Sequence, residues 1–286
     1  RGAVTRVLGA PGKLPVEGAR VVAGAGVDEP FPELVLAAAA ALPSGVRPED
    51  AEGRLDLRHL PFVTIDPTHA RDFDDAVVVE SLEAGRARVW VAVADVSHYV
   101  GAGTELEAEA QHRGCSLYLP DRAIPMLPPA LSAGTCSLVP DEDRLAMVVC
   151  LEIDESGRIV DQSAAAALIH SHGRLDYSGV AAALRGDFRG RRAGYLDHAA
   201  QLDALREVAA TLRGRRFGRG ALDLDLPEAE VVLDGDDPGR VRDIVQARPD
   251  RPIRQAYNLI EELMIAANEA VGRLLQNAGV PTIWRT

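Results

Sequence analysis

A long amphipathic helix near the C-terminal end is the strongest hydrophobic pattern in the chain. Apolar residues recur there at intervals of three and four, which is the spacing of one helix face. The pattern predicts a helix over residues 255–278, and Gly279 stands where a glycine commonly ends a helix. The apolar positions are Leu259, Ile260, Leu263, Met264, Ala267, Val271, Leu274 and Leu275.

Short apolar or alternating runs bounded by turn residues predict strands. Two pairs of runs have the spacing of hairpins, one around residues 155–158 and one within 229–247, with its turn at 235–239. A period-two run at 221–226 places Asp223 and Asp225 on one face of a further strand. The remaining predicted strands are 62–65, 77–80, 87–94, 147–153 and 159–169.

Three shorter helices complete an α/β (α+β) pattern. They are expected at 33–42, at 197–213, and from Thr104, whose hydroxyl can cap a helix while Glu107 reaches back. Residues 1–54 are rich in Gly, Pro and Ala and are interpreted as a lead-in segment. Nothing between residues 55 and 286 resembles an interdomain linker, so that stretch is interpreted as one domain.

Composition excludes several classes of protein. Hydrophobic residues make up 47% and charged residues 26% of the chain, which is typical of a globular protein. No apolar run is long enough to span a membrane. The three cysteines Cys115, Cys136 and Cys150 are widely spaced without a CxxC motif, which argues against a zinc cage and a disulfide-linked partner. We therefore expect a protein of the reducing cytoplasm.

Charge alone argues against nucleic-acid binding, because the net charge is −12. Positive charge is nevertheless concentrated in residues 185–219, which contain nine arginines and only four acidic residues. Arginine is well suited to phosphate, because its planar fork can bind two oxygens at once. Arg215 and Arg216, in the run RGRRFGRG, are therefore candidate RNA contacts. A solvated helix end explains the same run equally well.

Candidate chemistry is concentrated in the segment Phe62-Val-Thr-Ile-Asp-Pro-Thr-His-Ala-Arg-Asp-Phe-Asp-Asp-Ala76. Its four carboxylates lie between strand-like runs, where their mutual repulsion calls for a cation, and Mg²⁺ prefers such hard oxygen ligands. An extended segment would point Asp72 and Asp74 in the same direction, and Asp66 and Asp75 could complete the set. A solvated acidic turn remains open as the alternative. An EF-hand is excluded because its Gly and Glu are not in register.

Four blocks of sequence carry a resemblance to a known family. They are VTIDPTHARDFDDA, WVAVADVSHYV, RGCSLYLPDRAIPMLPPALSAGTCSL and NLIEELMIAAN. In this order and spacing they resemble the catalytic (RNB) domain of the ribonuclease II / ribonuclease R family, with a closer likeness to the ribonuclease R branch. The resemblance covers roughly residues 55–286.

The resemblance implies a fold and an activity. The fold would be a mixed or antiparallel sheet with helices packed around an RNA channel. The activity would be processive 3′→5′ hydrolysis of single-stranded RNA to nucleoside 5′-monophosphates, with one or two Mg²⁺ ions, for which Mn²⁺ is a substitute. A non-catalytic RNA-binding or regulatory member of the same fold is the alternative. Oligomeric state cannot be read from the sequence.

Individual residues acquire roles through the same resemblance. Asp66, Asp72, Asp74 and Asp75 match the family's catalytic, metal-binding carboxylates, with Asp74 expected to matter most for chemistry. Tyr118 matches a tyrosine that stacks on a base, Tyr177 a residue that helps distinguish RNA from DNA, and Glu261 a contact to the last nucleotide. Taken without the family, these three would be an ordinary strand, loop and helix-surface residue. His98, His170 and His172 are interpreted as ordinary strand or loop histidines.

The ends of the chain also bear on domain organisation. Residues 1–54 resemble the segment that joins the family's cold-shock-like domain to its catalytic domain. The chain stops at Trp284-Arg285-Thr286, about two-thirds through that catalytic domain, so we expect a fragment of a longer protein. The family's arginine segment and its S1-type RNA-binding domain would lie beyond this point.

Overall fold

The computed structural model describes residues 3–4, 6–222, 229–235, 237, 239–247 and 251–284. The chain divides into two compact units, each described here by itself. The larger unit comprises Pro43–Val96, Ala133–Leu224 and Arg248–Thr286, and the smaller unit comprises Arg1–Leu42, Ser97–Ser132 and Asp225–Ala247. The predicted strand at 221–226 falls largely outside the described residues.

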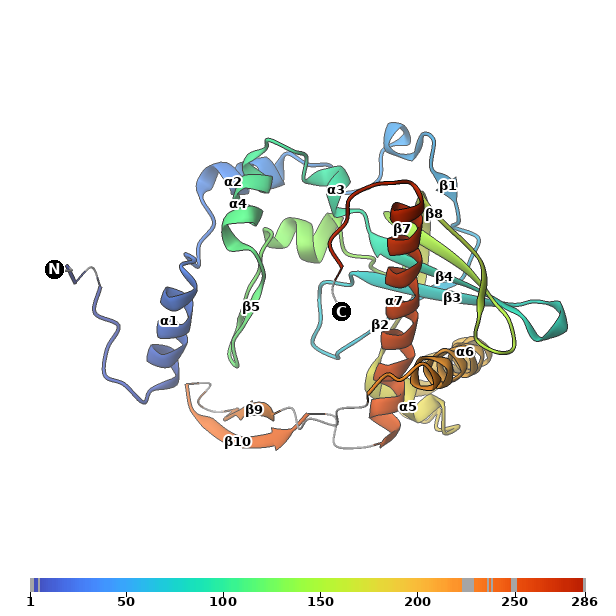
Figure 1. The fold of residues 1–286 in the computed structure, drawn as a ribbon. Coiled ribbons are helices and arrows are strands. Elements are labelled where there is room, and N and C mark those ends of the chain that lie inside the picture. Colours follow the sequence, from blue (N-terminus) through green and yellow to red (C-terminus); the bar gives the residue numbers. More distant parts are fainter. Residues whose placement is uncertain are drawn as a thin grey trace. The chain divides into compact units, whose positions relative to one another are not determined.

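A six-stranded mixed sheet forms the framework of the larger unit (Figure 1). Its strands follow the order β1-β8-β2-β3-β4-β7, and β8 also pairs with β7, so the sheet closes on itself through β8. The strands are β1 (Leu55–Asp56), β2 (Phe62–Asp66), β3 (Asp75–Ser81), β4 (Ala87–Ala94), β7 (Asp143–Ile153) and β8 (Ile159–Asp176).

Strand β8 is long enough to pair with three strands, which are β7, β2 and, at Ala167 and Leu168, β1. Its first part pairs antiparallel with β7, and its last six residues pair parallel with β2. In this parallel register Asp66 lies beside Asp176, at the point where both strands end. The pairing therefore brings the end of β2 next to whatever follows β8 in the chain.

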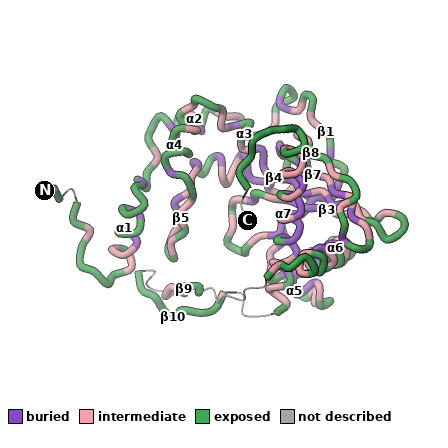
Figure 2. The backbone as a smooth tube through the Cα atoms, viewed as in Figure 1, coloured by how far each residue is buried: buried purple, intermediate pink, exposed green. Residues whose placement is uncertain are grey.

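Three helices pack on the strands and enclose the main core. They are α5 (Tyr177–Ala183), α6 (Ala199–Gly218) and α7 (Arg251–Asn277). The core joins sheet residues such as Val63, Val91 and Leu151 to helix residues such as Leu205 and Leu263. Figure 2 shows these buried positions gathered where α7 meets the strands. The short segments of the larger unit are η1 (Pro48–Ala51), η2 (Glu83–Gly85), η4 (Gly190–His198) and, at its boundaries, α3 (Val96–Tyr99) and η3 (Leu131–Thr135).

Helix α7 confirms the strongest sequence prediction. Its apolar face is buried, and it ends two residues before Gly279, whose φ of +70° is the left-handed conformation that glycine adopts without strain. The backbone N–H of Val280 donates to the carbonyl of Leu275 at 2.9 Å, which satisfies one of the otherwise unpaired carbonyls of the last turn.

A buried ion pair fixes α6 against α7. The Glu262 side chain is only 2% exposed, and its carboxylate accepts hydrogen bonds from Arg213 Nη1 at 3.1 Å and from Arg216 Nη2 at 2.6 Å. Arg216 Nε donates to the second carboxylate oxygen at 3.0 Å. Two guanidinium groups therefore compensate one buried negative charge at this helix contact.

The smaller unit is organised around the buried side chain of Arg113. Its guanidinium donates to Glu109 Oε1 at 2.7 Å and to the carbonyl of Asp28 at 3.0 Å, and it lies 3.7 Å from the centre of the Phe31 ring. Two hairpins and three helices make up the unit. They are α1 (Leu14–Ala25), α2 (Glu33–Ala40), α4 (Glu105–Arg113), β5 (Leu117–Tyr118), β6 (Ala123–Ile124), β9 (Ala229–Leu233) and β10 (Val241–Gln246).

The mixed α/β fold class is confirmed, and so are most of the predicted elements. Thr104 caps α4, with its hydroxyl accepting from the N–H of Glu107 at 3.2 Å. Helix α1 was not predicted, because Pro15, Gly18 and Gly24 are poor helix formers and the surrounding segment is rich in glycine and proline. The division at residue 54 stays a prediction. Within the described residues, no helix is long and apolar enough to cross a membrane.

The Glu262 ion pair gives a test of this packing. We expect Glu262→Ala to lower the free energy of unfolding by about 3–5 kcal/mol, because it leaves two arginines without their buried partner. Glu261→Ala, on the adjacent half-exposed residue, should cost less than about 1 kcal/mol. Urea unfolding of both variants measures the change in the free energy of unfolding. Equal changes would show that the buried Glu262 ion pair does not stabilise the α6–α7 contact.

Candidate active site

The four aspartates lie on one loop between β2 and β3. Asp66 ends β2, Asp75 begins β3, and Asp72 and Asp74 flank Phe73 between them. Phe73 is buried, its N–H donates to Ser137 Oγ at 2.9 Å, and its carbonyl accepts from the N–H of Leu138 at 2.8 Å. The loop is thus pinned to the core through Phe73, while both flanking carboxylates stay at least partly accessible.

Asp66 and Asp176 stand side by side in the sheet and have opposite surroundings. Asp176 caps α5, and its carboxylate accepts from the N–H of Gly179 at 2.9 Å and from the hydroxyl of Tyr195 at 2.9 Å. These and neighbouring hydrogen bonds outweigh burial and lower the pKa of Asp176. Asp66 Oδ2 is buried and has no hydrogen-bond partner among the described residues. Asp176 is therefore compensated by hydrogen bonds, whereas Asp66 keeps one buried oxygen without such a bond, and the nearby Thr64 hydroxyl and Arg174 charge offset its burial only in part.

The four carboxylates interact electrostatically in a continuous series. Burial, followed by the charge of Asp75, raises the pKa of Asp66 to about 7. Burial and the charge of Asp74 raise the pKa of Asp75 to about 6. Burial and the charge of Asp72 raise the pKa of Asp74. Desolvation and mutual repulsion therefore make the ionised cluster unfavourable, as expected for carboxylates without a counterion.

The chemistry of this donor set fits a hard divalent cation. Four carboxylates, one of them with a buried unpartnered oxygen, supply the type of ligand that Mg²⁺ and Mn²⁺ take. Among the described residues, however, no three His, Cys, Asp or Glu side chains converge closely enough to hold a metal ion. The four carboxylates are thus close enough to repel one another, but their oxygens do not converge on a single metal position.

Two tyrosines stack at the same end of the sheet. Tyr177 directly follows Asp176 and so lies at the sheet end where Asp66 emerges. Its ring packs against that of Tyr257 on α7, with 3.7 Å between centroids and an interplanar angle of 17°. Glu261 lies one turn further along α7, where its carboxylate accepts from Arg216 Nη2 at 3.4 Å. Tyr257 was not singled out from the sequence, because only its helical spacing from Glu261 points to it.

A hollow opens beside the aspartate loop. It has a cavity volume of about 620 Å³ and is lined by His69, Arg71 and Arg174 among others. Arg174 Nη2 donates to the carbonyls of Thr68 at 2.8 Å and Ala70 at 3.3 Å, so it holds the loop while placing a positive charge near Asp66. This role of Arg174 could not be predicted from the sequence, since Arg174 reaches the loop only through the β2–β8 pairing.

The remaining predicted contacts lie elsewhere. Tyr118 is on β5 of the smaller unit and is 74% exposed, so the structure does not bring it together with the aspartates in one unit. Arg215 is exposed near the end of α6. Arg216 is engaged with Glu262, which accounts for its charge within the fold. The RNA-binding roles of these three residues stay predictions.

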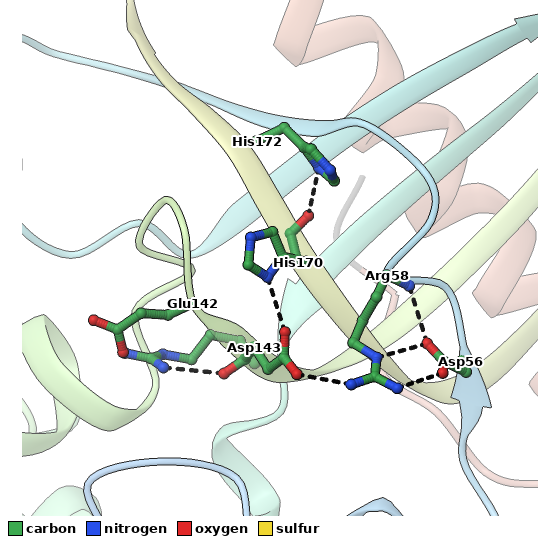
Figure 3. Close-up of polar contacts among 7 residues, drawn as sticks. Asp56, Arg58, Glu142, Asp143, His170 and His172 are labelled. Atoms are coloured by element: carbon green, nitrogen blue, oxygen red, sulfur yellow. Dashed lines mark hydrogen bonds and ion pairs between the residues drawn. The ribbon is translucent and has the colours of Figure 1, made fainter.

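The histidines of β8 belong to a polar network at another edge of the sheet (Figure 3). His170 Nδ1 is 2.8 Å from Asp143 Oδ1, and Arg58 donates to the other oxygen of Asp143 at 3.0 Å. Arg58 also binds Asp56 of β1, and His172 Nδ1 donates to the carbonyl of His170 at 3.0 Å. The network ties β1 to β7 and β8, in agreement with the interpretation of His170 and His172 as structural residues.

Comparisons with known proteins point to one family. The RNB domain matches residues 54–286. Ribonuclease R of Thermotoga maritima is 42% identical over 288 residues, covering 99% of this chain and 39% of that protein. Mycoplasma genitalium RNase R in complex with ribose methylated single-stranded RNA is 30% identical with a TM-score of 0.86, and its complex with double-stranded RNA is 31% identical with a TM-score of 0.87. They cover 97% of this chain and 42% and 48% of those chains. This chain therefore spans less than half the length of these relatives.

The raised pKa values predict how stability depends on pH. Because folding raises the pKa values of Asp66 and Asp75, the folded state binds their protons more tightly than the unfolded state does. Their contribution to stability is therefore present near pH 4 and is lost as the pH rises to about 7. In EDTA, Asp66→Asn should raise Tm at pH 7.5 by about 2–4 °C, which corresponds to ~1 kcal/mol, and should leave it unchanged near pH 4.

Glu83→Gln provides the matched control, since it removes an exposed carboxylate from the β3–β4 turn. It should leave the pH dependence of Tm as it is. The Tm values of the unmodified chain, of Asp66→Asn and of Glu83→Gln are measured by thermal unfolding between pH 4 and 8. A fall in Tm for Asp66→Asn at pH 7.5 would contradict an uncompensated carboxylate at this position.

Proposed function

Because the chain belongs to the RNB domain family, we propose that it carries the catalytic centre of a 3′→5′ exoribonuclease. Its substrate is single-stranded RNA, which it shortens processively to nucleoside 5′-monophosphates. The observation that carries the proposal is the aspartate cluster at the end of β2, where a buried oxygen of Asp66 lacks any partner among the described residues. Membership of the family indicates RNA as the substrate, and the repulsion among the four carboxylates favours binding of a cation.

We assign the cation to Asp66, Asp72, Asp74 and Asp75. When bound, one or two Mg²⁺ ions, or Mn²⁺ in their place, supply an activated water and stabilise negative charge on the scissile phosphate. The chain itself holds the four carboxylates in place through Phe73 and through the hydrogen bonds of Arg174 to the loop. Asp74 is the most accessible of the four, and removing it leaves the pinned part of the loop intact.

Three further residues are assigned to the RNA. Tyr177, whose ring stacks on that of Tyr257, is assigned to the terminal nucleotide, where it helps to distinguish RNA from DNA. Glu261, one turn beyond Tyr257, is assigned to the last nucleotide. Tyr118 contributes an exposed ring on which a base of any sequence can stack.

A non-catalytic RNA-binding or regulatory role is the second candidate. It is favoured by one observation, that no three acidic, His or Cys side chains of the described chain converge on a metal position. Such a protein would bind RNA with steep salt dependence and would release no nucleotides in the presence of Mg²⁺.

We further propose that residues 55–286 belong to the catalytic domain and residues 1–54 to the segment leading into it. We also propose a cytoplasmic location without a disulfide-linked partner, on the wide spacing of the three cysteines in the sequence. Since the chain spans less than half of its relatives, the full activity is proposed for the family's catalytic centre and is tested below with this chain and with a longer chimera.

Loss of Asp74 tests the catalytic assignment. With a 5′-labelled single-stranded RNA and Mg²⁺, we expect a ladder that shortens from the 3′ end and disappears in EDTA. Asp74→Asn should slow this reaction by about 100-fold or more, because a metal-stabilised charge is worth several kcal/mol. Binding of the RNA in a gel-shift assay should persist in the variant.

The assay is run on this chain and on the same chain joined to the remaining segments of a ribonuclease R relative. Degradation by the joined protein alone would locate the missing contribution in those segments. RNA binding without degradation by either protein would refute the exonuclease and favour the non-catalytic alternative.

Tyr118 provides a separate test of RNA contact. We expect Tyr118→Ala to weaken binding of single-stranded RNA by about 1–3 kcal/mol regardless of base sequence, since the ring stacks on a base. Tyr118→Phe keeps the ring and should bind nearly as well as the unmodified chain. Fluorescence anisotropy in EDTA measures both variants, and equal affinities for all three proteins would rule out base stacking at this position.

A further inference from the structure

A second positively charged feature lies on the larger unit, in a groove between α6, α7 and the β7–β8 turn. The groove has a cavity volume of about 100 Å³. Its polar lining consists of Arg158, Arg215, Arg216, Arg219, Arg273 and two glutamates, Glu262 and Glu269. Figure 1 shows α6 and α7 adjacent along this side. No role in the proposed reaction has been assigned to Arg158, Arg219 or Arg273.

The carboxylates of the groove do not neutralise its arginines. Glu269 is shared by Arg219, at 3.1 Å, and Arg273, at 2.7 Å. Glu262 is shared in the same way by Arg213 and Arg216. Arg158 also binds Asp154 at 3.1 Å, and Arg216 also binds Glu261 at 3.4 Å. With Arg213, six arginines therefore stand against four carboxylates and leave a net of two positive charges. In a chain with a net charge of −12, such a local excess favours an anionic ligand.

The groove is continuous with the proposed site through one side chain. Arg216 lines the groove and also donates to Glu261, the residue assigned to the last nucleotide. From Glu261 to Arg273 the helix advances about 18 Å at ~1.5 Å per residue. At about 3.4 Å per charge along one stacked strand, this length spans about five backbone phosphates.

We propose that this arginine groove is a secondary binding site for the phosphate backbone of single-stranded nucleic acid. The assignment rests on the proposed function, since it is the adjoining RNA site that favours a nucleic acid over an acidic peptide. Guanidinium groups suit the ligand because each can bind two phosphate oxygens at once. The groove reads no bases, so it adds affinity and salt dependence without sequence preference.

The test measures salt dependence of binding in EDTA, where no RNA is degraded. The variant Arg219→Gln/Arg273→Gln removes the two guanidiniums that share Glu269, whose side chains are 50% and 43% exposed. Fluorescence anisotropy is measured with a 12-nucleotide and a 3-nucleotide poly-U RNA between 50 and 300 mM salt. For the 12-nucleotide RNA, the slope of log K against log salt should fall by ~1.4, about 0.7 for each lost phosphate contact. For the 3-nucleotide RNA it should not change.

Two further variants serve as controls. Arg86→Gln/Arg206→Gln removes the same charge from the larger unit, outside the groove, at arginines that are each 45% exposed and also ion-paired. It should leave both slopes unchanged. Arg219→Lys/Arg273→Lys keeps the charge and should retain the slope of the unmodified chain, which guards against a folding defect in the glutamine variant.

Three outcomes would overturn the proposal. Equal slope changes in the groove and control variants would show an effect of net charge alone. An unchanged slope for the 12-nucleotide RNA would show that no phosphate occupies the groove. Equal loss of affinity for a polyglutamate peptide would indicate an acidic protein partner. Because these measurements are made in EDTA, they stand apart from the metal-dependent degradation that tests the proposed function.

Discussion

The site depends on one constraint, the pairing of one part of β8 with β7 and of its last part with β2. Its antiparallel pairing with β7 and its parallel pairing with β2 close the sheet, and the parallel register sets Asp66 beside Asp176. This register places Tyr177, which follows β8, where its ring stacks on Tyr257. It also places Arg174 where its guanidinium can donate to the aspartate loop. A slip of one residue in β2 would turn Asp66 to the opposite face of the sheet and dissolve this arrangement.

The two aspartates of that register differ in how fully the fold satisfies their charge. Hydrogen bonds from Gly179 and Tyr195 satisfy Asp176, and its pKa is lowered. Asp66 receives no such bond on its buried oxygen, and its pKa rises to about 7. Buried polar groups are usually paired, so an unpaired carboxylate oxygen is costly to stability, and a ligand can offset that cost. In the groove between α6 and α7, Glu262 is likewise compensated by two arginines, whereas the arginines at the groove outnumber its carboxylates.

Local patterns predicted most of the fold, because the period of α7 and the alternation of β3, β4 and β7 are recorded in consecutive residues. The aspartates were equally visible, since their four carboxylates stand between two strands. Arg174 and Tyr257 were not, because each acquires its role from a partner far away in the chain, and an isolated Arg or Tyr carries no pattern. Arg216 illustrates the converse: its charge was visible in sequence, while its engagement with Glu262 required the packing of α6 on α7.

The central claim is that the aspartate cluster is an uncompensated charge that a divalent cation relieves. Isothermal titration of the chain with Mg²⁺ at pH 6.5, repeated in buffers of different ionisation enthalpy, measures the protons released on binding. With the pKa of Asp66 raised to about 7, we expect binding to release roughly half a proton or more, and we expect Asp66→Asn to lower that release to the smaller share from Asp75, whose pKa is about 6. Absence of Mg²⁺ binding, or binding without proton release that Asp66→Asn leaves unchanged, would contradict the central claim.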